Sequence, residues 1–81
     1  MIRVRYEPNK MCKRLVDDTT IEKLREVEGA TFTSFAKLER AIGWKPYVSG
    51  NMFRCDVKRL QYYCELKFEE DSHRVTVVKV Y

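Results

Sequence analysis

The chain has 81 residues, of which 44% are hydrophobic and 35% charged, and its net charge at pH 7 is +4. We therefore expect one folded domain over residues 1–81, and the composition excludes a disordered or collagen-like chain. No apolar run approaches the roughly 20 residues of a membrane span, and no long apolar segment follows the first basic residues, so we expect a cytoplasmic protein without a membrane partner. The basic surplus favours an anionic partner such as nucleic acid.

Residues that commonly bind metals or act as nucleophiles are sparse. His73 is the single histidine, and Cys12, Cys55 and Cys64 show no CxxC spacing, so neither a zinc site nor a cofactor is expected. Reduced core cysteines are expected in a cytosol, where a Cys55–Cys64 disulfide is disfavoured. The chain contains no G-x-S-x-G, P-loop or G-x-G-x-x-G motif, which argues against conventional hydrolases, kinases and dehydrogenases.

The first third of the chain predicts a strand followed by helices. Residues 2–7 alternate apolar and polar side chains, as a half-buried strand does, and helical spacing follows over residues 11–16. Thr19 and Glu22 have the spacing of a capping box and predict a helix over residues 20–28. A glycine directly after this helix is expected to end it.

The remainder predicts one more helix and then strands. Apolar residues share one helical face over residues 34–42, and Gly43 ends that pattern. Alternation with a period of two then predicts strands over 53–57, 60–68 and 74–81. The expected fold class is α+β: an N-terminal strand, two to three short helices, then a three-stranded antiparallel meander, with the helices packed on one face of the sheet.

Basic and tyrosine side chains gather on the uncovered face of this predicted sheet. Cations neutralise phosphates and a tyrosine stacks on a base, so this face is a candidate RNA surface. The candidate nucleic-acid-binding residues are Lys58, Arg59, Tyr63 and Lys67. A ribonuclease that needs no metal also requires cations at the scissile phosphate and an acid–base group. The candidate cations for the scissile phosphate are Arg54 and Arg74. Asp56 and Glu65 oppose phosphate binding on the same face, so charges that only solvate the sheet are the competing interpretation.

The segment FRCDVKRLQYYCEL, residues 53–66, is similar in pattern and spacing to the central hairpin of the RelE/ParE-type toxins. The segment HRVTVVKV, residues 73–80, resembles the final strand of that family, and the order of elements is similar over the whole chain. The resemblance implies a small toxin with a curved antiparallel sheet, backed by N-terminal helices and neutralised by an antitoxin. RelE-like members cut mRNA on the ribosome, whereas ParE-like members act on gyrase.

The same resemblance implies roles for single residues. Arg54 stands where the family often has a basic residue, and Tyr81 is the one residue in place of a basic and aromatic tail. With the resemblance, the candidate catalytic residues are Arg54, Arg74 and Tyr81. Asp56 and Gln61 depart from positions that are often basic in the nucleases. The leading prediction is a RelE-like protein that acts on RNA, either as an mRNA endoribonuclease or as a degenerate relative of one.

Two other functions fit the sequence. One is a winged-helix-like nucleic-acid-binding module, in which helices 20–28 and 34–42 form a helix–turn–helix and a hairpin over residues 53–68 forms the wing. Lys37 and Arg40 would then be exposed toward the nucleic acid. The other is a protein-interaction or inhibitor module, whose edge strands pair with a protein partner.

Overall fold

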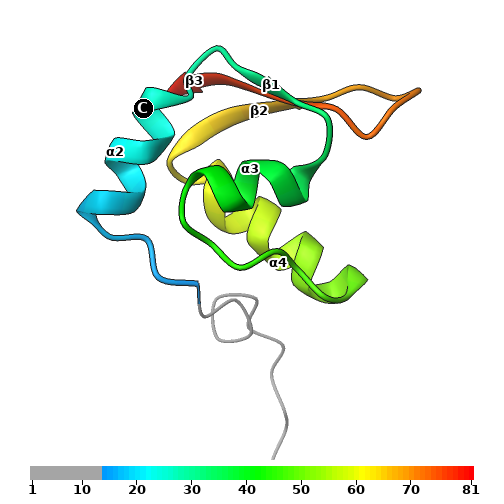
Figure 1. Ribbon diagram of the computed structural model, residues 1–81, viewed down its shortest axis with the longest axis horizontal. Coiled ribbons are helices and arrows are strands. Elements are labelled where there is room, and N and C mark those ends of the chain that lie inside the picture. The colour runs from blue at the N-terminus through cyan, green and yellow to red at the C-terminus, as the bar shows by residue number, and fades with distance from the viewer. Residues whose placement is uncertain (1–13) are drawn as a thin grey trace, which may run out of the picture.

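A computed structural model describes residues 14–81 of the chain (Figure 1). In chain order the elements are α2 (Asp18–Glu26), β1 (Thr31–Phe32), α3 (Phe35–Ala41), α4 (Gly50–Gln61), β2 (Cys64–Phe68) and β3 (Val75–Val80). The three strands form one antiparallel sheet in the order β1-β3-β2. The predicted α+β class is confirmed, as is the antiparallel pairing of the last two strands. The strand predicted over residues 2–7 lies outside the described residues.

The strand predicted over residues 53–57 is wrong, and so is the hairpin predicted over 53–68, because residues 50–61 form α4. Residues i and i+4 share a face in both a strand and a helix, so Phe53 and Val57 fit either element. Leu60 separates the two interpretations. Leu60 is fully buried and lies seven positions after Phe53. Seven positions are about two turns of a helix, so the two residues share a helical face, whereas in a strand they would point to opposite faces.

Both ends of α4 carry helix signals. The Ser49 hydroxyl accepts a hydrogen bond from the Met52 amide at 3.2 Å and caps the first turn. Lys58 and Arg59 lie in the last turn, where cations interact favourably with the negative end of the helix dipole. These two residues, predicted to form the tip of a hairpin, therefore stabilise the end of a helix.

The third strand of the sheet is β1, in a segment that the sequence predicted as a turn. Thr31 pairs with Thr76 and Phe32 pairs with Val75 on the central strand β3. The hydroxyl oxygens of Thr31 and Thr76 lie 2.8 Å apart across this pair. A strand of two residues is too short to show any alternation, which is why the period of two did not reveal it.

The helix ends follow local chemistry. α2 is capped by Asp17 and not by Thr19, since the Asp17 carboxylate accepts a hydrogen bond from the Thr20 amide at 2.9 Å. The glycines predicted to end the helices are confirmed in that place. Gly29 and Gly43 have φ values of 84° and 86°, a left-handed conformation that a side chain disfavours.

The three helices within residues 14–81 cover the same face of the sheet, as predicted, and each packs on a different strand (Figure 1). α2 contacts β3, α3 contacts β1, and α4 contacts β2. The buried core between the layers consists of Leu24, Phe35, Leu38, Ile42, Trp44, Leu60, Cys64, Val75 and Val77. Strand β3, which is apolar on both faces, takes the central place that such a strand predicts. Within residues 14–81, no helix has the length and apolarity to cross a membrane.

Candidate nucleic-acid interface

The second half of the fold is a helix, a connection, a second helix and a β-hairpin. α3 is followed by the connection 42–49, then by α4 and by the hairpin of β2 and β3. The helices predicted over residues 20–28 and 34–42 are present as α2 and α3, but β1 lies between them, and the hairpin spans residues 64–80 instead of 53–68. The helix directly before this hairpin is α4, which follows α3 in the chain. In helix–turn–helix proteins the second helix of the pair reads the bases.

A stripe of long polar side chains follows the exposed side of α4. The helix α4 stripe, as we call it, consists of Asn51, Arg54, Lys58 and Gln61. The spacing of three, four and three residues places all four on one helical face, and all four are exposed. At about 1.5 Å of rise per residue the stripe is roughly 15 Å long. The single acidic residue of α4, Asp56, is 1% exposed, so the stripe carries two cations and no carboxylate.

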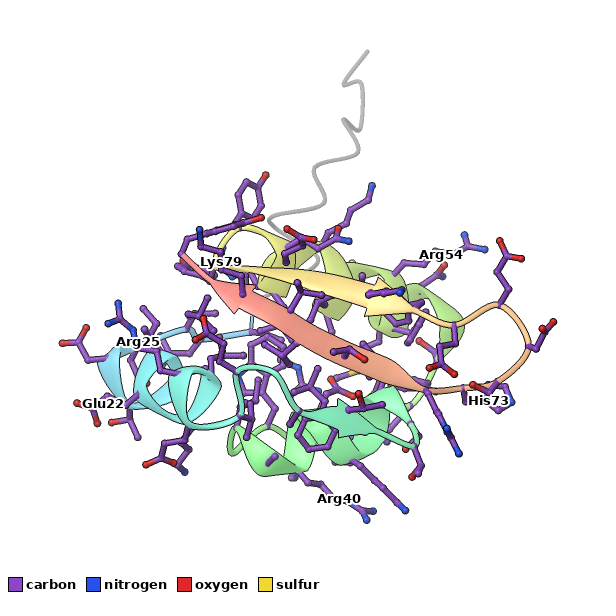
Figure 2. The ribbon with its side chains drawn as sticks, turned by 90° about the horizontal axis from the view of Figure 1, so that it is seen from above. Glu22, Arg25, Arg40, Arg54, His73 and Lys79 are labelled. Atoms are coloured by element: carbon purple, nitrogen blue, oxygen red, sulfur yellow. The ribbon has the colours of Figure 1, made fainter. Side chains whose placement is uncertain are left out.

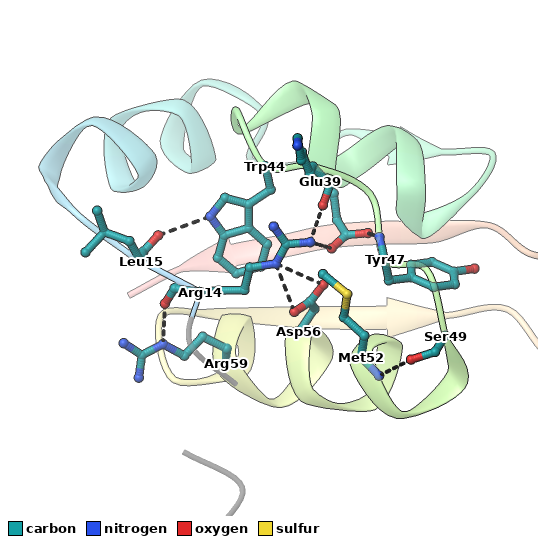
Figure 3. Close-up of polar contacts among 10 residues, drawn as sticks. Arg14, Leu15, Glu39, Trp44, Tyr47, Ser49, Met52, Asp56 and Arg59 are labelled. Atoms are coloured by element: carbon teal, nitrogen blue, oxygen red, sulfur yellow. Dashed lines mark hydrogen bonds and ion pairs between the residues drawn. The ribbon is translucent and has the colours of Figure 1, made fainter. Parts of the chain in front are cut away.

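A buried ionic cluster joins α3 to α4 on the inner side of the pair (Figure 3). Arg14 Nε lies 3.2 Å and 3.4 Å from the two carboxylate oxygens of Asp56. Arg14 Nη2 lies 3.7 Å from Glu39 Oε2. Glu39 is 0% exposed and Asp56 is 1% exposed, so a carboxyl group from each helix is buried against one arginine. Such a cluster restrains the two helices, because removing Arg14 or Asp56 would leave the other charge buried without its partner.

Burial has a direct electrostatic consequence for Glu39. Desolvation raises the pKa of this carboxyl from its ordinary 4.5 to about 8, with a further rise from the neighbouring Asp56. The hydrogen bond from the Tyr47 amide and the positive charge of Arg14 both lower the pKa of Glu39, but they do not cancel the rise. The Oε2 atom of Glu39 is buried and has no hydrogen-bond partner within the described part of the chain. Glu39 is therefore mostly protonated and uncharged at pH 7, and Asp56 is the carboxylate that Arg14 neutralises.

The connection between α3 and α4 is held by hydrogen bonds to the same cluster. Glu39 Oε1 accepts a hydrogen bond from the Tyr47 amide at 2.9 Å, and the Glu39 carbonyl accepts one from the Trp44 amide at 2.7 Å. The guanidinium of Arg14 donates to the Lys45 carbonyl and lies 5.3 Å from the Trp44 ring centroid. The start of α4 is thus set by contacts to buried groups, although the connection has no regular secondary structure.

Arg59 was predicted to bind nucleic acid, but in the structure it serves the same internal assembly. Its side chain is half-buried, and Nε donates a hydrogen bond to the Arg14 carbonyl at 3.1 Å (Figure 3). The Trp44 indole donates to the next carbonyl, that of Leu15, at 3.1 Å. Arg59 therefore anchors the segment before α2 and is only partly available to a ligand.

The structure does not bring the three predicted catalytic residues together. Arg74 precedes β3 and Tyr81 follows it, and the seven steps along the chain between them, at about 3.3 Å each, place them roughly 23 Å apart. Arg54 lies on α4, at the same end of the molecule as the tip of the hairpin, where His73 lies (Figure 2). Arg54, Arg74 and Tyr81 are all exposed, but they do not converge on one point.

The remaining predicted binding residues are also dispersed. Lys58 belongs to the helix α4 stripe. Tyr63 is half-buried against the core, and its carbonyl accepts the Tyr81 amide at 3.0 Å. Lys67 is exposed on β2, opposite Thr76.

The uncovered face of the sheet carries charges of both signs. Glu65 pairs with Lys79 across the β2–β3 ladder, two residues along the strand from Lys67. The turn of the hairpin is acidic, with Glu69, Glu70 and Asp71 exposed. This distribution gives the sheet no continuous positive surface for a phosphate backbone.

Several residues of the candidate interface and of the cluster behind it were missed by sequence reasoning. Asn51, Glu39 and Arg14 drew no attention, and Asp56 was placed on an exposed strand. The signal that finds Asn51 and Gln61 is the helical period of α4, which places them with Arg54 and Lys58. Nothing in the sequence alone pairs Arg14 with Asp56, which are 42 residues apart.

Metal-ligating side chains and cysteines are further groups for which the sequence set an expectation. Residues 14–81 contain no cluster of three metal-ligating side chains. Cys55 is disulfide-bonded, so the expectation of reduced cysteines is wrong for this residue. Cys64 is a free thiol, so the Cys55–Cys64 disulfide is not formed. Burial raises the pKa of the Cys64 thiol to about 11, which keeps it protonated and unreactive at neutral pH.

Comparison of the chain with protein-family models, with curated proteins and with solved structures found no match. The RelE/ParE resemblance therefore stays a prediction. The motif on which it was chiefly based, residues 53–66, is mostly helix α4 and not a hairpin.

Proposed function

We propose that this protein binds duplex DNA by placing α4 in the major groove, as a winged-helix-like module. The observation that carries the proposal is the helix α4 stripe. In the major groove, arginine and lysine usually form hydrogen bonds with guanine, and asparagine and glutamine usually form them with adenine. Four side chains of these types on one exposed helical face, without a carboxylate among them, match the chemistry of base edges.

The surrounding fold supports this use of α4. The major groove is about 12 Å wide and admits a single helix, provided that its neighbours hold it rigidly and leave one side open. The buried Arg14–Asp56 pair and the capped connection hold α4 against α3 on the inner side. Lys37 and Arg40 are exposed on α3, the helix that would cross the phosphate backbone.

An RNA-cutting function is less well supported by the geometry. A metal-independent ribonuclease needs its cations and its acid–base group around one phosphate. Arg74 and Tyr81 lie at opposite ends of β3. The acidic turn of the hairpin and the Glu65–Lys79 pair further reduce the attraction of the sheet for RNA.

Fluorescence anisotropy with labelled duplex DNA and labelled single-stranded RNA, at low and physiological salt, tests the proposal. Arg54→Ala/Lys58→Ala should weaken duplex binding by about 30-fold or more, since each base contact contributes about 1–3 kcal/mol. The matched control is Arg25→Ala/Lys79→Ala, which removes the same charge from exposed positions at the other end of the molecule (Figure 2).

Two results would overturn the DNA-binding proposal. One is equal loss of affinity in both double variants, which would mean that net charge alone drives the binding. The other is tight binding or cleavage of the RNA with no affinity for duplex DNA. The RNA probe is therefore checked for integrity after each titration.

A further inference from the structure

An aromatic pocket of 610 Å³ opens between the starts of α3 and α4 and the tip of the hairpin. Its walls are four rings from four different segments. They are Phe35 of α3, Tyr47 of the connection, Phe53 of α4 and Phe68 of β2. The volume lies within the range of about 300–1,000 Å³ that is usual for small-molecule sites. The pocket is distinct from the helix α4 stripe, none of whose four residues lines it.

The rings form a connected edge-to-face array that is incomplete toward the opening. The Phe53 ring lies 5.2 Å from Phe35, at an interplanar angle of 83°, and 5.0 Å from Tyr47, at 62°. Phe68 lies 6.3 Å from Phe53 at 71°, and it is still 40% exposed. One more planar ring placed in the opening would continue this array and cover Phe68.

The rim of the aromatic pocket provides hydrogen-bonding groups but, in the described part of the chain, no carboxylate, ammonium or guanidinium group. Thr33, Ser34, Ser72 and His73 line it, and these side chains both donate and accept. No carboxylate, ammonium or guanidinium group from residues 14–81 lines the pocket. A ligand with a full charge would lose hydration there without gaining an ionic partner, so the lining selects an uncharged molecule.

From these observations we propose that the aromatic pocket binds an uncharged planar heteroaromatic compound, of the size and hydrogen-bonding character of a nucleobase or an indole. The ring stacks against Phe53 and Phe68, and its polar edge meets the hydroxyls of Thr33 and Ser34 and the imidazole of His73. Such a ligand contacts the first turn of α4 and the tip of the hairpin at once. It therefore adds to the Phe53–Phe68 ring contact that already joins α4 to β2.

Gly50 supplies a sharp test, because it lines the pocket in the first turn of α4. A Cβ at Gly50 would meet no atom within 4 Å, and its φ is not positive, so a side chain fits there without strain. Gly50→Leu should fill the pocket and leave the fold intact. Val48→Leu is the matched control, since Val48 is 88% exposed and does not line the pocket.

The measurement is a titration of isotope-labelled protein followed by amide chemical shifts, with adenine and indole as probes. Cyclohexanol is the non-planar comparison, and benzoate and benzylamine are the charged ones. Adenine or indole should bind with a dissociation constant below about 1 mM, which corresponds to a modest free energy for a small ring. The shifts should centre on Phe53, Phe68 and His73, and Gly50→Leu should weaken binding at least tenfold while Val48→Leu does not.

Three results would overturn the proposal. The first is that neither adenine nor indole binds. The second is that cyclohexanol or a charged probe binds as tightly as the planar probes. The third is that the planar probes bind Gly50→Leu as tightly as the unsubstituted protein. Thermal melts of both variants distinguish a filled pocket from a lost fold. If Gly50→Leu does not fold, Phe68→Ala removes one stacking ring from a partly exposed site and should weaken adenine binding instead.

Discussion

Replacing Glu39 by glutamine should stabilise this protein at alkaline pH. Glu39 is fully buried, and its pKa is raised from 4.5 to about 8 by burial and by Asp56. An acid whose pKa is higher in the folded protein than in the unfolded chain must take up a proton on folding at any pH between the two values. Stability is therefore highest below pH 4.5, falls as the pH rises to about 8, and is constant above that.

The size of this effect follows from the two pKa values. Their difference, from 4.5 to about 8, corresponds to about 5 kcal/mol at 1.36 kcal/mol per pH unit. We take this as an upper limit, because Glu39 and Asp56 titrate together. A glutamine has the shape of the protonated acid, and its oxygen still accepts the hydrogen bond of the Tyr47 amide. Glu39→Gln should therefore remove the loss of stability that Glu39 contributes between pH 4.5 and about 8.

Urea denaturation at a series of pH values, followed by the fluorescence of the single tryptophan, Trp44, measures the effect. Glu22→Gln, on the exposed surface of α2, is the control for the loss of one carboxylate (Figure 2). The difference in unfolding free energy between Glu39→Gln and the unsubstituted protein should grow through this range and then level off. Parallel curves for the two proteins would refute the argument that Glu39 takes up a proton on folding.

Other substitutions test the parts that position α4. Asp56→Ala leaves Arg14 without its main carboxylate and should cost about 3–5 kcal/mol in a urea titration, whereas an unchanged midpoint would show that the pair contributes nothing. Ser49→Ala removes the cap of α4 and should cost about 1 kcal/mol, and Ser49→Asp should restore most of it. Gly43→Ala places a side chain at a φ of 86° and within 3.1 Å of the Lys23 ammonium, so its melting temperature should fall, while Gly50→Ala should not lower it. Lys37→Ala/Arg40→Ala should weaken binding to all duplex sequences alike, and a loss confined to one sequence would place α3 at the bases.

The sequence predicts some residues of the candidate site better than others. Arg54 and Lys58 were recognised as cations that could meet nucleic acid, and both are exposed on α4. The surface to which they were assigned, the face of a sheet, does not contain them. A period of two and a period of 3.6 agree at positions i and i+4, so the grouping of Phe53 with Val57 leaves the element ambiguous. The burial of Leu60 resolves that ambiguity, and burial is a property of the fold.

The sequence by itself determined the α+β class, the ends of helices at Gly29 and Gly43, and the pairing of the last two strands. These features depend on interactions among residues that are near in the chain, namely backbone conformation, side-chain alternation and a short turn. The tertiary structure alone decided that a strand of two residues completes the sheet, and that Arg14, Glu39 and Asp56 meet in the interior. Those contacts join residues that are 17 to 45 positions apart, where no local pattern carries a signal and only the packing of the helices on the sheet brings them together.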